Sequence, residues 1–200
     1  MLFPENKTDF VIVTDYDAQV KLYPTFLTES QALSTYNLIK EQVTLEHENI
    51  FMFGKRYVLQ RQVAWIADEG ISYAYNKKRW NPQAWPPTLK VIKEKIEHLV
   101  GASFNSCLIN YYPTGNDGMG YHQDNEPALG PNPIIASVSL GAARKFTLKH
   151  LIDKTVIQTN LPSGSLLYMG GACQHRWKHA LPKTAKETGP RLNLTFRKII

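Results

Sequence analysis

Cysteine is scarce in this sequence, which has only Cys107 and Cys173 in its 200 residues. Two cysteines in these surroundings do not form the repeated pattern of a disulfide framework, so the class of small secreted proteins held together by disulfides is excluded. We expect both thiols to be reduced.

Long apolar runs are also missing. The longest weakly polar stretch, residues 134–143, is interrupted by serines and is far shorter than the roughly 20 residues of a membrane span. The first ten residues include Pro4, Glu5, Asn6 and Asp9 and lack the apolar segment of a secretion signal. We therefore expect no membrane partner and a cytoplasmic location, with the nucleus left open.

Internal repeats and low-complexity linkers are absent as well, so nothing divides the sequence into separate folding units. Two hundred residues, of which 43% are apolar, suffice for one domain over residues 1–200 with a packed core. The net charge of +6 favours a polyanionic partner without identifying it. The sequence does not decide the oligomeric state, and a monomer is our working expectation.

The regular elements that the sequence does contain predict a mainly β fold with flanking helices. Thr28 and Gln31 have capping-box spacing before a helix over 28–43, and a second helix is expected between Pro87 and Gly101. Strands are expected over 50–65, 104–112, 134–140, 145–150, 155–159, 165–169 and 191–197. Short strands separated by turns rich in proline and glycine are typical of a double-stranded β-helix, or jelly roll, here of the α+β class.

His122, Asp124 and His179 form the most informative pattern. If residues 122–124 are a strand, His122 and Asp124 point to the same face because side chains alternate. A distant histidine, His179, would complete a set of two imidazoles and one carboxylate. Such a set leaves about three coordination positions open and is typical of non-haem Fe(II) oxygenases.

The segment 191–197 places Arg191, Asn193, Thr195 and Arg197 on one face of a predicted strand. Alone, this pattern is most often a polar face turned to water. Beside a metal site it favours a carboxylate-binding pocket, because a guanidinium group binds a carboxylate through two hydrogen bonds.

Other interpretations of these residues remain open. Cys173, His175 and His179 could be ligands of a structural zinc ion, although that interpretation leaves His122 and Asp124 without a role. A second alternative is a jelly roll that binds nucleic acid without catalysis. A third keeps the oxygenase chemistry and changes the substrate to RNA, a protein side chain or a lipid.

Four blocks together resemble the AlkB family: residues 110–112 (NYY), 122–126 (HQDNE), 177–179 (WKH) and 191–197 (RLNLTFR). The resemblance runs from about residue 51 to the C-terminus. The family consists of Fe(II)- and 2-oxoglutarate-dependent dioxygenases that repair alkylated nucleic acid. The sequence around residues 53–55 and 194–199 looks most like that of the branch that acts on duplex DNA.

The resemblance implies three cofactors or co-substrates: Fe(II), 2-oxoglutarate and O2. It implies that iron is held by His122, Asp124 and His179, and that 2-oxoglutarate is bound by Arg191, Arg197, Thr195, Asn110 and Tyr112. The reaction would release succinate, carbon dioxide and formaldehyde while removing the methyl group of 1-methyladenine or 3-methylcytosine. In this interpretation residues 1–50 form an N-terminal extension with one helix, 51–100 the substrate-recognition hairpins and helix, and 101–200 the catalytic jelly roll.

The same resemblance implies how alkylated DNA, duplex or single-stranded, or RNA would be bound. A base must leave the stack to reach a buried site. Tyr73 and Tyr75 match the segment that contacts the damaged base, and Glu126 matches an acidic position facing its amino group. Phe53 is expected at a hairpin tip, where it would wedge into the base stack or instead pack as an ordinary core residue. Arg61 is expected to contact phosphate, although its strand departs from the family pattern.

Overall fold

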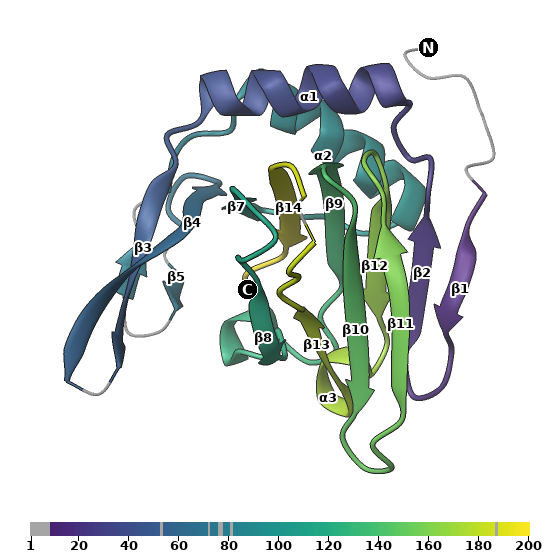
Figure 1. The fold of residues 1–200 in the computed structure, drawn as a ribbon. Coiled ribbons are helices and arrows are strands. Elements are labelled where there is room, and N and C mark those ends of the chain that lie inside the picture. Colours follow the sequence, from purple (N-terminus) through teal and green to yellow (C-terminus); the bar gives the residue numbers. More distant parts are fainter. Residues whose placement is uncertain (1–8, 53, 72, 76–77, 81, 187) are drawn as a thin grey trace.

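The structure, a computed structural model, describes residues 9–200 except 53, 72, 76–77, 81 and 187. Within residues 49–52, 55–56, 73–75 and 78–80 it describes the backbone and not the side chains. Two antiparallel sheets face each other over these residues and form a jelly roll (Figure 1). The mainly β fold with flanking helices is therefore confirmed.

The larger sheet consists, in spatial order, of β1 (Val11–Thr14), β2 (Gln19–Tyr23), β12 (Leu166–Gly170), β9 (Ile135–Gly141), β14 (Arg191–Arg197), β7 (Ser106–Tyr112), β4 (Lys55–Ala67) and β3 (Glu46–Met52). The smaller sheet consists of β11 (Val156–Leu161), β10 (Arg144–His150), β13 (Trp177–Leu181) and β8 (Met119–His122). A separate hairpin joins β5 (Tyr73–Tyr75) to β6 (Lys78–Trp80). The apolar cluster between the larger and the smaller sheet includes Val20, Leu148 and Trp177.

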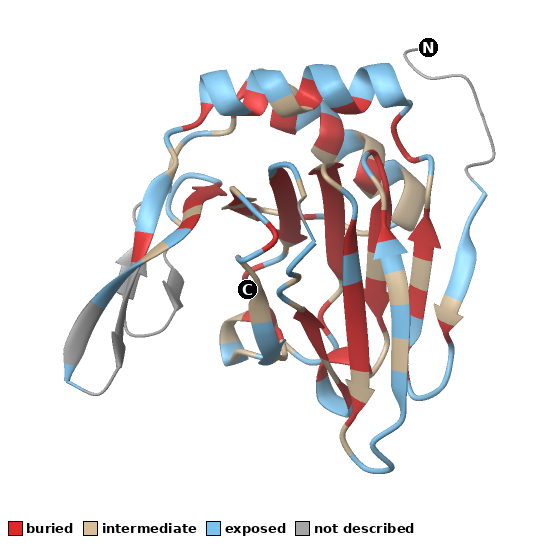
Figure 2. Ribbon diagram, viewed as in Figure 1, coloured by how far each residue is buried: buried red, intermediate tan, exposed pale blue. Residues whose placement is uncertain are grey.

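Two helices cover the outer face of the larger sheet. α1 (Glu29–Gln42) begins with the predicted capping box, and α2 (Pro87–Val100) ends at Gly101 with a positive φ of 67°. Ile39 of α1 and Ile96 of α2 are buried in one apolar cluster. The same cluster contains Leu192, Leu194 and Phe196 of β14. The burial pattern in Figure 2 shows these inward faces of the helices. Over the described residues, no helix is long and apolar enough to cross a membrane.

The sequence did not predict β1 and β2, and it placed no strand at 177–181. β1 is a four-residue edge strand whose Val11 and Ile12 are exposed, so its pattern lacks the alternation of a half-buried strand. β2 nevertheless pairs with β12, and β1 pairs with β2 at the edge of the larger sheet. The expected division into an extension (1–50), a substrate-recognition segment (51–100) and a catalytic jelly roll (101–200) remains a prediction.

Candidate functional site

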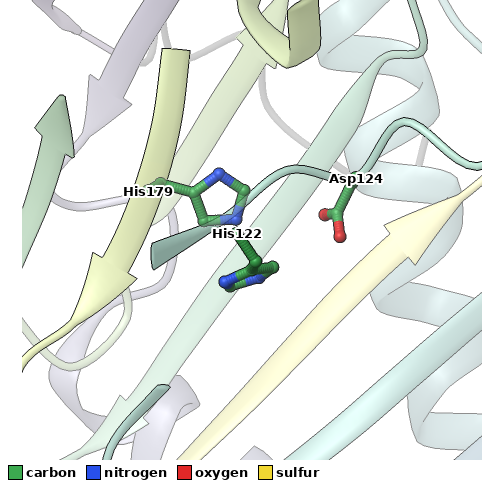
Figure 3. A group of neighbouring side chains, drawn as sticks. All are labelled: His122, Asp124 and His179. Atoms are coloured by element: carbon green, nitrogen blue, oxygen red, sulfur yellow. The ribbon is translucent and has the colours of Figure 1, made fainter. Parts of the chain in front are cut away.

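His122 and His179 are direct neighbours across two strands of the smaller sheet. The β8–β13 register pairs the two residues, and their ring centroids are 4.3 Å apart. With Asp124 they form a group whose ligand atoms all lie within 4.8 Å of one another (Figure 3). The structure therefore brings the three predicted ligands together.

Both imidazoles are placed so that a ring nitrogen can act as a metal ligand. Nδ1 of His122 lies 2.9 Å from the carbonyl oxygen of Gly120, which can only accept, so this contact leaves the Nε2 lone pair available. The His179 ring lies against Phe146, with centroids 5.5 Å apart. Burial lowers the pKa of His179 to about 3, which keeps its ring neutral. Its Nδ1 is buried and has no hydrogen-bond partner within the described part of the chain.

Asp124 departs from the prediction in one respect, because it does not lie on the strand. β8 ends at His122, and Asp124 follows in a loop. The loop leaves the sheet to meet α3 (Cys173–Arg176): the Asp124 N–H donates to Oε1 of Gln174 at 3.0 Å, and Nε2 of Gln123 donates to the Gln174 carbonyl at 2.8 Å. Gln174 is fully buried. This residue therefore fixes the position of the carboxylate.

Sequence reasoning missed Gln174. Nothing in the local pattern distinguishes it from other polar residues near His179, since its contacts are with a loop fifty residues earlier. Only the folded chain shows that the two ligand-bearing segments share this side chain.

Arg197 contacts the metal-site carboxylate directly. Its Nη2 donates to Oδ1 of Asp124 at 2.8 Å, and both side chains are largely buried. Burial opposes ionisation of Asp124, but Arg197 and the nearby His179 outweigh it, so the pKa of Asp124 stays below its usual value. Asp124 is consequently an ionised ligand at neutral pH.

The polar face of β14 lines the same cavity as the three predicted ligands. Arg191 donates through Nη2 to Ser139 Oγ at 2.9 Å and to Asn193 Oδ1 at 2.7 Å. Asn193 donates in turn to Thr195 Oγ1 at 2.6 Å. Alternation along the strand thus gives the continuous polar row that the sequence predicted.

Arg191 is a buried cation without a carboxylate partner in the described part of the chain. It is 1% exposed, and no acidic side chain among the described residues lies within ion-pairing distance of it. Burial lowers the pKa of Arg191 to about 10, so it still carries its charge at neutral pH. Its guanidinium carbon lies 5.5 Å from the ring centroid of Tyr112. An anion in the cavity would compensate this charge.

The neighbouring strand β7 supplies the other two predicted pocket residues. Asn110 and Tyr112 are 5% and 4% exposed and line the cavity. Oδ1 of Asn110 is buried without a hydrogen-bond partner among the described residues. The structure therefore gathers all five residues predicted to bind 2-oxoglutarate around one cavity.

Arg61 lies in the cavity wall, which differs from the exposed position expected for a phosphate contact. It is 7% exposed and forms an ion pair with Glu48 of β3, another residue that sequence reasoning missed. Its Nη1 also lies 3.3 Å from the sulfur of Met119. Burial by itself would lower the pKa of Arg61, but Tyr112 and Glu48 raise it above its usual value.

The remaining predicted substrate residues are less well defined. Glu126 is half-buried, belongs to no strand, and precedes a short 3-10 helix (Pro127–Leu129), so it does not share a strand face with Asp124 as expected. Phe53 lies outside the described residues. Tyr73 and Tyr75 belong to β5, of which the structure describes the backbone only.

Arg144 of β10 is a structural residue that the sequence analysis also missed. It is 3% exposed and donates to the carbonyl oxygens of Thr114, Gly115, Asp117 and Pro182 at 3.2, 3.4, 2.7 and 2.8 Å. The guanidinium therefore joins the loop before β8 to the loop after β13. Both loops flank the strands that carry the candidate ligands.

The alternative zinc site does not form. Throughout the part of the chain that the structure describes, His122, Asp124 and His179 are the only group of three or more potential ligands with closely spaced atoms. Cys173 is buried, and burial raises the pKa of its thiol to about 12. His175 instead accepts a hydrogen bond of 3.4 Å from the Asn132 N–H.

Comparison with known proteins agrees with this geometry. The profile of the "2OG-Fe(II) oxygenase superfamily" matches residues 19–197. The human "DNA oxidative demethylase ALKBH2" is 38% identical over 157 residues, which cover 74% of this chain and 60% of that protein. The Bos taurus "Alpha-ketoglutarate-dependent dioxygenase alkB homolog 3" is 34% identical over 192 residues, 91% of this chain and 66% of that protein. The chain thus spans about three fifths to two thirds of these relatives' length.

A solved structure supports the fold independently. "The structure of OsALKBH1" superposes with a TM-score of 0.63 at 20% sequence identity and covers 90% of this chain and 97% of that one. At this identity the similarity concerns the fold alone. The family profile, which matches most of the chain, and the relatives above 30% identity together show that this chain belongs to the 2OG-Fe(II) oxygenase superfamily and, within it, to the AlkB family.

Proposed function

We propose that this chain is an Fe(II)- and 2-oxoglutarate-dependent oxidative demethylase that repairs N-alkylated bases, 1-methyladenine and 3-methylcytosine among them, in DNA. The observation that carries the proposal is one cavity lined both by the His122, Asp124 and His179 side chains and by the uncompensated guanidinium of Arg191. A metal site and a site for a dicarboxylate thus share one cavity.

The residues present fit the metal that the family implies. Two neutral imidazoles and one ionised carboxylate are the donor set of non-haem Fe(II) oxygenases. Nδ1 of His179 is buried without a hydrogen-bond partner among the described residues, and the contact of His122 Nδ1 with the Gly120 carbonyl leaves its Nε2 lone pair available. His122, Asp124 and His179 would hold the metal.

The residues also fit 2-oxoglutarate. Arg191 would pair with one of its carboxylates, because its buried charge has no acidic partner among the described residues. Asn110 presents a buried oxygen without a partner, and Tyr112 lies beside Arg191. The pocket therefore offers both charge and hydrogen bonds to such a ligand.

When bound, iron and 2-oxoglutarate would supply oxidative decarboxylation and hydroxylation of the methyl group. The chain itself would orient the reactants and exclude water. Phe146 and Met169 line the cavity with Trp65, so apolar walls surround the polar groups. In such a site each charge interaction is stronger than it would be in water.

DNA as the substrate is supported by the similarity to the human DNA oxidative demethylase and by the β3–β4 hairpin. This hairpin extends away from the jelly roll, with the backbone register running from Glu46 opposite Val63 to Met52 opposite Lys55. An extended hairpin beside the cavity is suited to holding a polymer while one base is turned out of the stack.

The decisive experiment is mass spectrometry of oligonucleotides that contain 1-methyladenine or 3-methylcytosine. They are incubated with the protein, Fe(II), ascorbate and 2-oxoglutarate as duplex DNA, single-stranded DNA and RNA. We expect loss of one methyl group from DNA and no loss with the His122→Ala variant. If the wild-type protein demethylates RNA alone, the substrate class is wrong; if it demethylates none of them, the activity is wrong.

A further inference from the structure

Both large sheets end in an edge strand on the same side of the molecule. β1 is an edge strand of the larger sheet, β11 is an edge strand of the smaller sheet, and the two strands lie next to each other. Within the described residues, β1 pairs only with β2, and β11 pairs only with β10. Every second residue of an edge strand turns its N–H and C=O groups away from the sheet. This side of the molecule therefore offers main-chain groups to a further strand.

These two edges lack the residues that usually protect an exposed strand. β1 (VIVT) and β11 (VIQTNL) contain no charged residue and no proline. Natural proteins commonly place charged side chains or proline in edge strands, because these residues prevent pairing with another chain. The opposite edge of the larger sheet, β3, carries the exposed Glu46. The composition of β1 and β11 thus permits pairing with a partner.

Apolar side chains surround the free edge of β1. Val11 and Ile12 are 59% and 57% exposed, and Phe10, which precedes the strand, is 46% exposed. Val156 of β11 is 48% exposed. Figure 2 shows β1 mainly in the colour of exposed residues. We name Phe10, Val11, Ile12 and Val156 the β1 edge. Its side chains lie on both faces of the strand, because successive side chains alternate.

The β1 edge is bounded by acidic residues. Asp9 precedes it and Asp15 follows it; both are exposed, and neither forms an ion pair among the described residues. Residues 9–23 contain three aspartates and one lysine, although the whole chain has a net charge of +6. The lysine, Lys21, lies on β2 with its Nζ 4.9 Å from the ring centroid of Phe10. The edge is therefore a locally acidic surface on a basic protein.

The hairpin that carries the β1 edge is fixed against the smaller sheet. Nε1 of Trp177 donates to the carbonyl oxygen of Tyr16, in the turn between β1 and β2, at 2.8 Å. The ring of Tyr16 also lies against His150, with ring centroids 4.9 Å apart. Trp177 and His150 are both almost fully buried. A strand that is already held in place loses little conformational freedom when a partner binds, which lowers the cost of association.

A second copy of the chain does not suit this edge. In a symmetric antiparallel pair centred on Ile12, Asp9 of one copy would lie opposite Asp15 of the other copy, at both ends of the pairing. Like charges directly opposite each other destabilise a pair of strands. A segment with basic residues at these two positions would instead form an opposite-charge pair with each aspartate.

We propose that the β1 edge binds an extended, apolar segment of a partner protein, with a lysine or arginine at each end, as an additional antiparallel strand. In this mode of recognition main-chain hydrogen bonds give affinity and alternate side chains give specificity. β1 is short and its register with β2 shifts between Ile12 and Thr14, so the apolar and charged contacts must add to the main-chain pairing.

This surface is separate from the candidate active site. None of the residues that line the cavity belongs to β1 or β11, both of which the structure describes in full. The inference therefore goes beyond the proposed function and does not depend on it.

The test measures the binding of labelled seven-residue peptides to the wild-type chain by fluorescence anisotropy. One peptide (KVTVTVK) has the proposed pattern, a second (EVTVTVE) has the opposite charge at its ends, and a third (KVTPTVK) has proline at its centre. We expect KVTVTVK to bind about 10-fold more tightly than EVTVTVE, because its ends face the two aspartates. KVTPTVK should also bind more weakly, since proline disrupts a strand.

Charge reversal on the protein locates the binding site. A variant with Asp9→Lys and Asp15→Lys should invert the preference, so that EVTVTVE binds more tightly than KVTVTVK. The matched control combines Glu41→Lys on α1 with Glu94→Lys on α2, which changes the net charge equally and should keep the wild-type preference. All four residues are exposed, and circular dichroism verifies that both variants are folded.

Hydrogen exchange followed by mass spectrometry reports on the strand itself. Bound KVTVTVK should slow exchange of the amides of residues 10–14 and leave those of α1 unchanged. The inference is overturned if no peptide binds, if KVTVTVK and EVTVTVE bind the wild type equally, or if residues 10–14 are not protected. Sedimentation of the wild type without peptide tests the other occupant: a dimer in which residues 10–14 are protected would assign the edge to a second copy instead.

Discussion

Arg197 donates a hydrogen bond of 2.8 Å from Nη2 to Oδ1 of Asp124, the carboxylate of the candidate metal site. The resemblance to AlkB proteins placed Arg197 among the residues that bind 2-oxoglutarate. In the structure, burial alone would raise the pKa of Asp124. The Arg197 guanidinium outweighs this effect and keeps the pKa below its usual value. The two arginines at the ends of β14 consequently have different partners: Arg191 donates to Ser139 and Asn193, and Arg197 donates to Asp124.

From this difference we predict that Arg197→Gln weakens metal binding. Removal of the cation leaves a buried carboxylate less stabilised in its ionised form, and such partners of metal ligands typically change affinity by about 10- to 100-fold. Titration with Co(II), followed by absorption spectroscopy, measures the effect directly. Asn193→Ala, on the same face of β14 but without contact to Asp124, is the control. Equal Co(II) affinity in wild type and Arg197→Gln would contradict the role.

Arg191→Met should weaken binding of 2-oxoglutarate without destabilising the protein in the absence of ligand. A charge-assisted pair is worth about 1.5–3 kcal/mol, so the requirement for 2-oxoglutarate should rise by roughly 10- to 150-fold. The pKa of Arg191, about 10, lies below the usual value because burial disfavours the cation. At neutral pH the charge therefore opposes folding, and this cost begins to decline only when the pH rises above about 10.

Thermal melting with and without 2-oxoglutarate checks both parts of this prediction. The wild type should gain stability on ligand addition, and Arg191→Met should gain less. A large loss of stability in the ligand-free variant would show instead that Arg191 is mainly a structural residue. Arg144→Met supplies the comparison, because Arg144 satisfies four backbone carbonyls and its loss should lower the melting temperature.

Gln174→Met should lower metal affinity although residue 174 is not a ligand. Methionine preserves the size of the side chain but cannot accept the Asp124 N–H, so the carboxylate loses its fixed position. We expect Co(II) to bind about 10-fold more weakly, and Gln174→Glu, which keeps an acceptor oxygen, to recover part of the affinity. Cys173→Ala, at the adjacent buried position, is the matched control. If both α3 variants lower affinity equally, general packing explains the result.

Asp153→Asn should reduce stability at pH 6 and have little effect near pH 2. The N–H of Thr155 lowers the pKa of Asp153 to about 2, although some burial opposes this, and His150 adds a further contact. A depressed carboxyl pKa contributes stability above the usual value of 3.8, and the contribution is lost as the pH falls towards 2. Melting temperatures at pH 6, 4 and 3 measure the convergence. The exposed Asp15→Asn variant should show no such trend.

Phe53→Ala should lower repair of duplex DNA more than repair of single-stranded DNA. The reason is the predicted wedge at the tip of the β3–β4 hairpin, since an apolar side chain between base pairs offsets the cost of unstacking. The ratio of kcat/KM values for the two substrates is the relevant measurement. An unchanged ratio would leave Phe53 with the alternative role of a packing residue.

The sequence predicted the parts of the site that depend on short-range periodicity. Alternation alone placed Arg191, Asn193, Thr195 and Arg197 on one face, and the structure has them there. His122 and Asp124 share the site even though β8 ends between them. The capping box of Thr28 and Gln31 was equally predictable from the sequence, because its two residues interact across one helical turn.

The parts that the sequence did not predict depend on contacts between distant segments. Gln174, Glu48 and Arg144 are ordinary polar residues in their local surroundings, and their roles arise from loops and strands that folding brings to them. The strand β1 was missed for a different reason, since a short, exposed edge strand carries little hydrophobic pattern.

The position of β8 at the edge of the smaller sheet has one further consequence. Only two register pairs, His179 with His122 and Leu181 with Met119, join it to β13, and the register shifts between them. A divalent ion bound by both imidazoles would cross-link these strands. Metal binding would then raise the resistance of residues 113–126 to proteases.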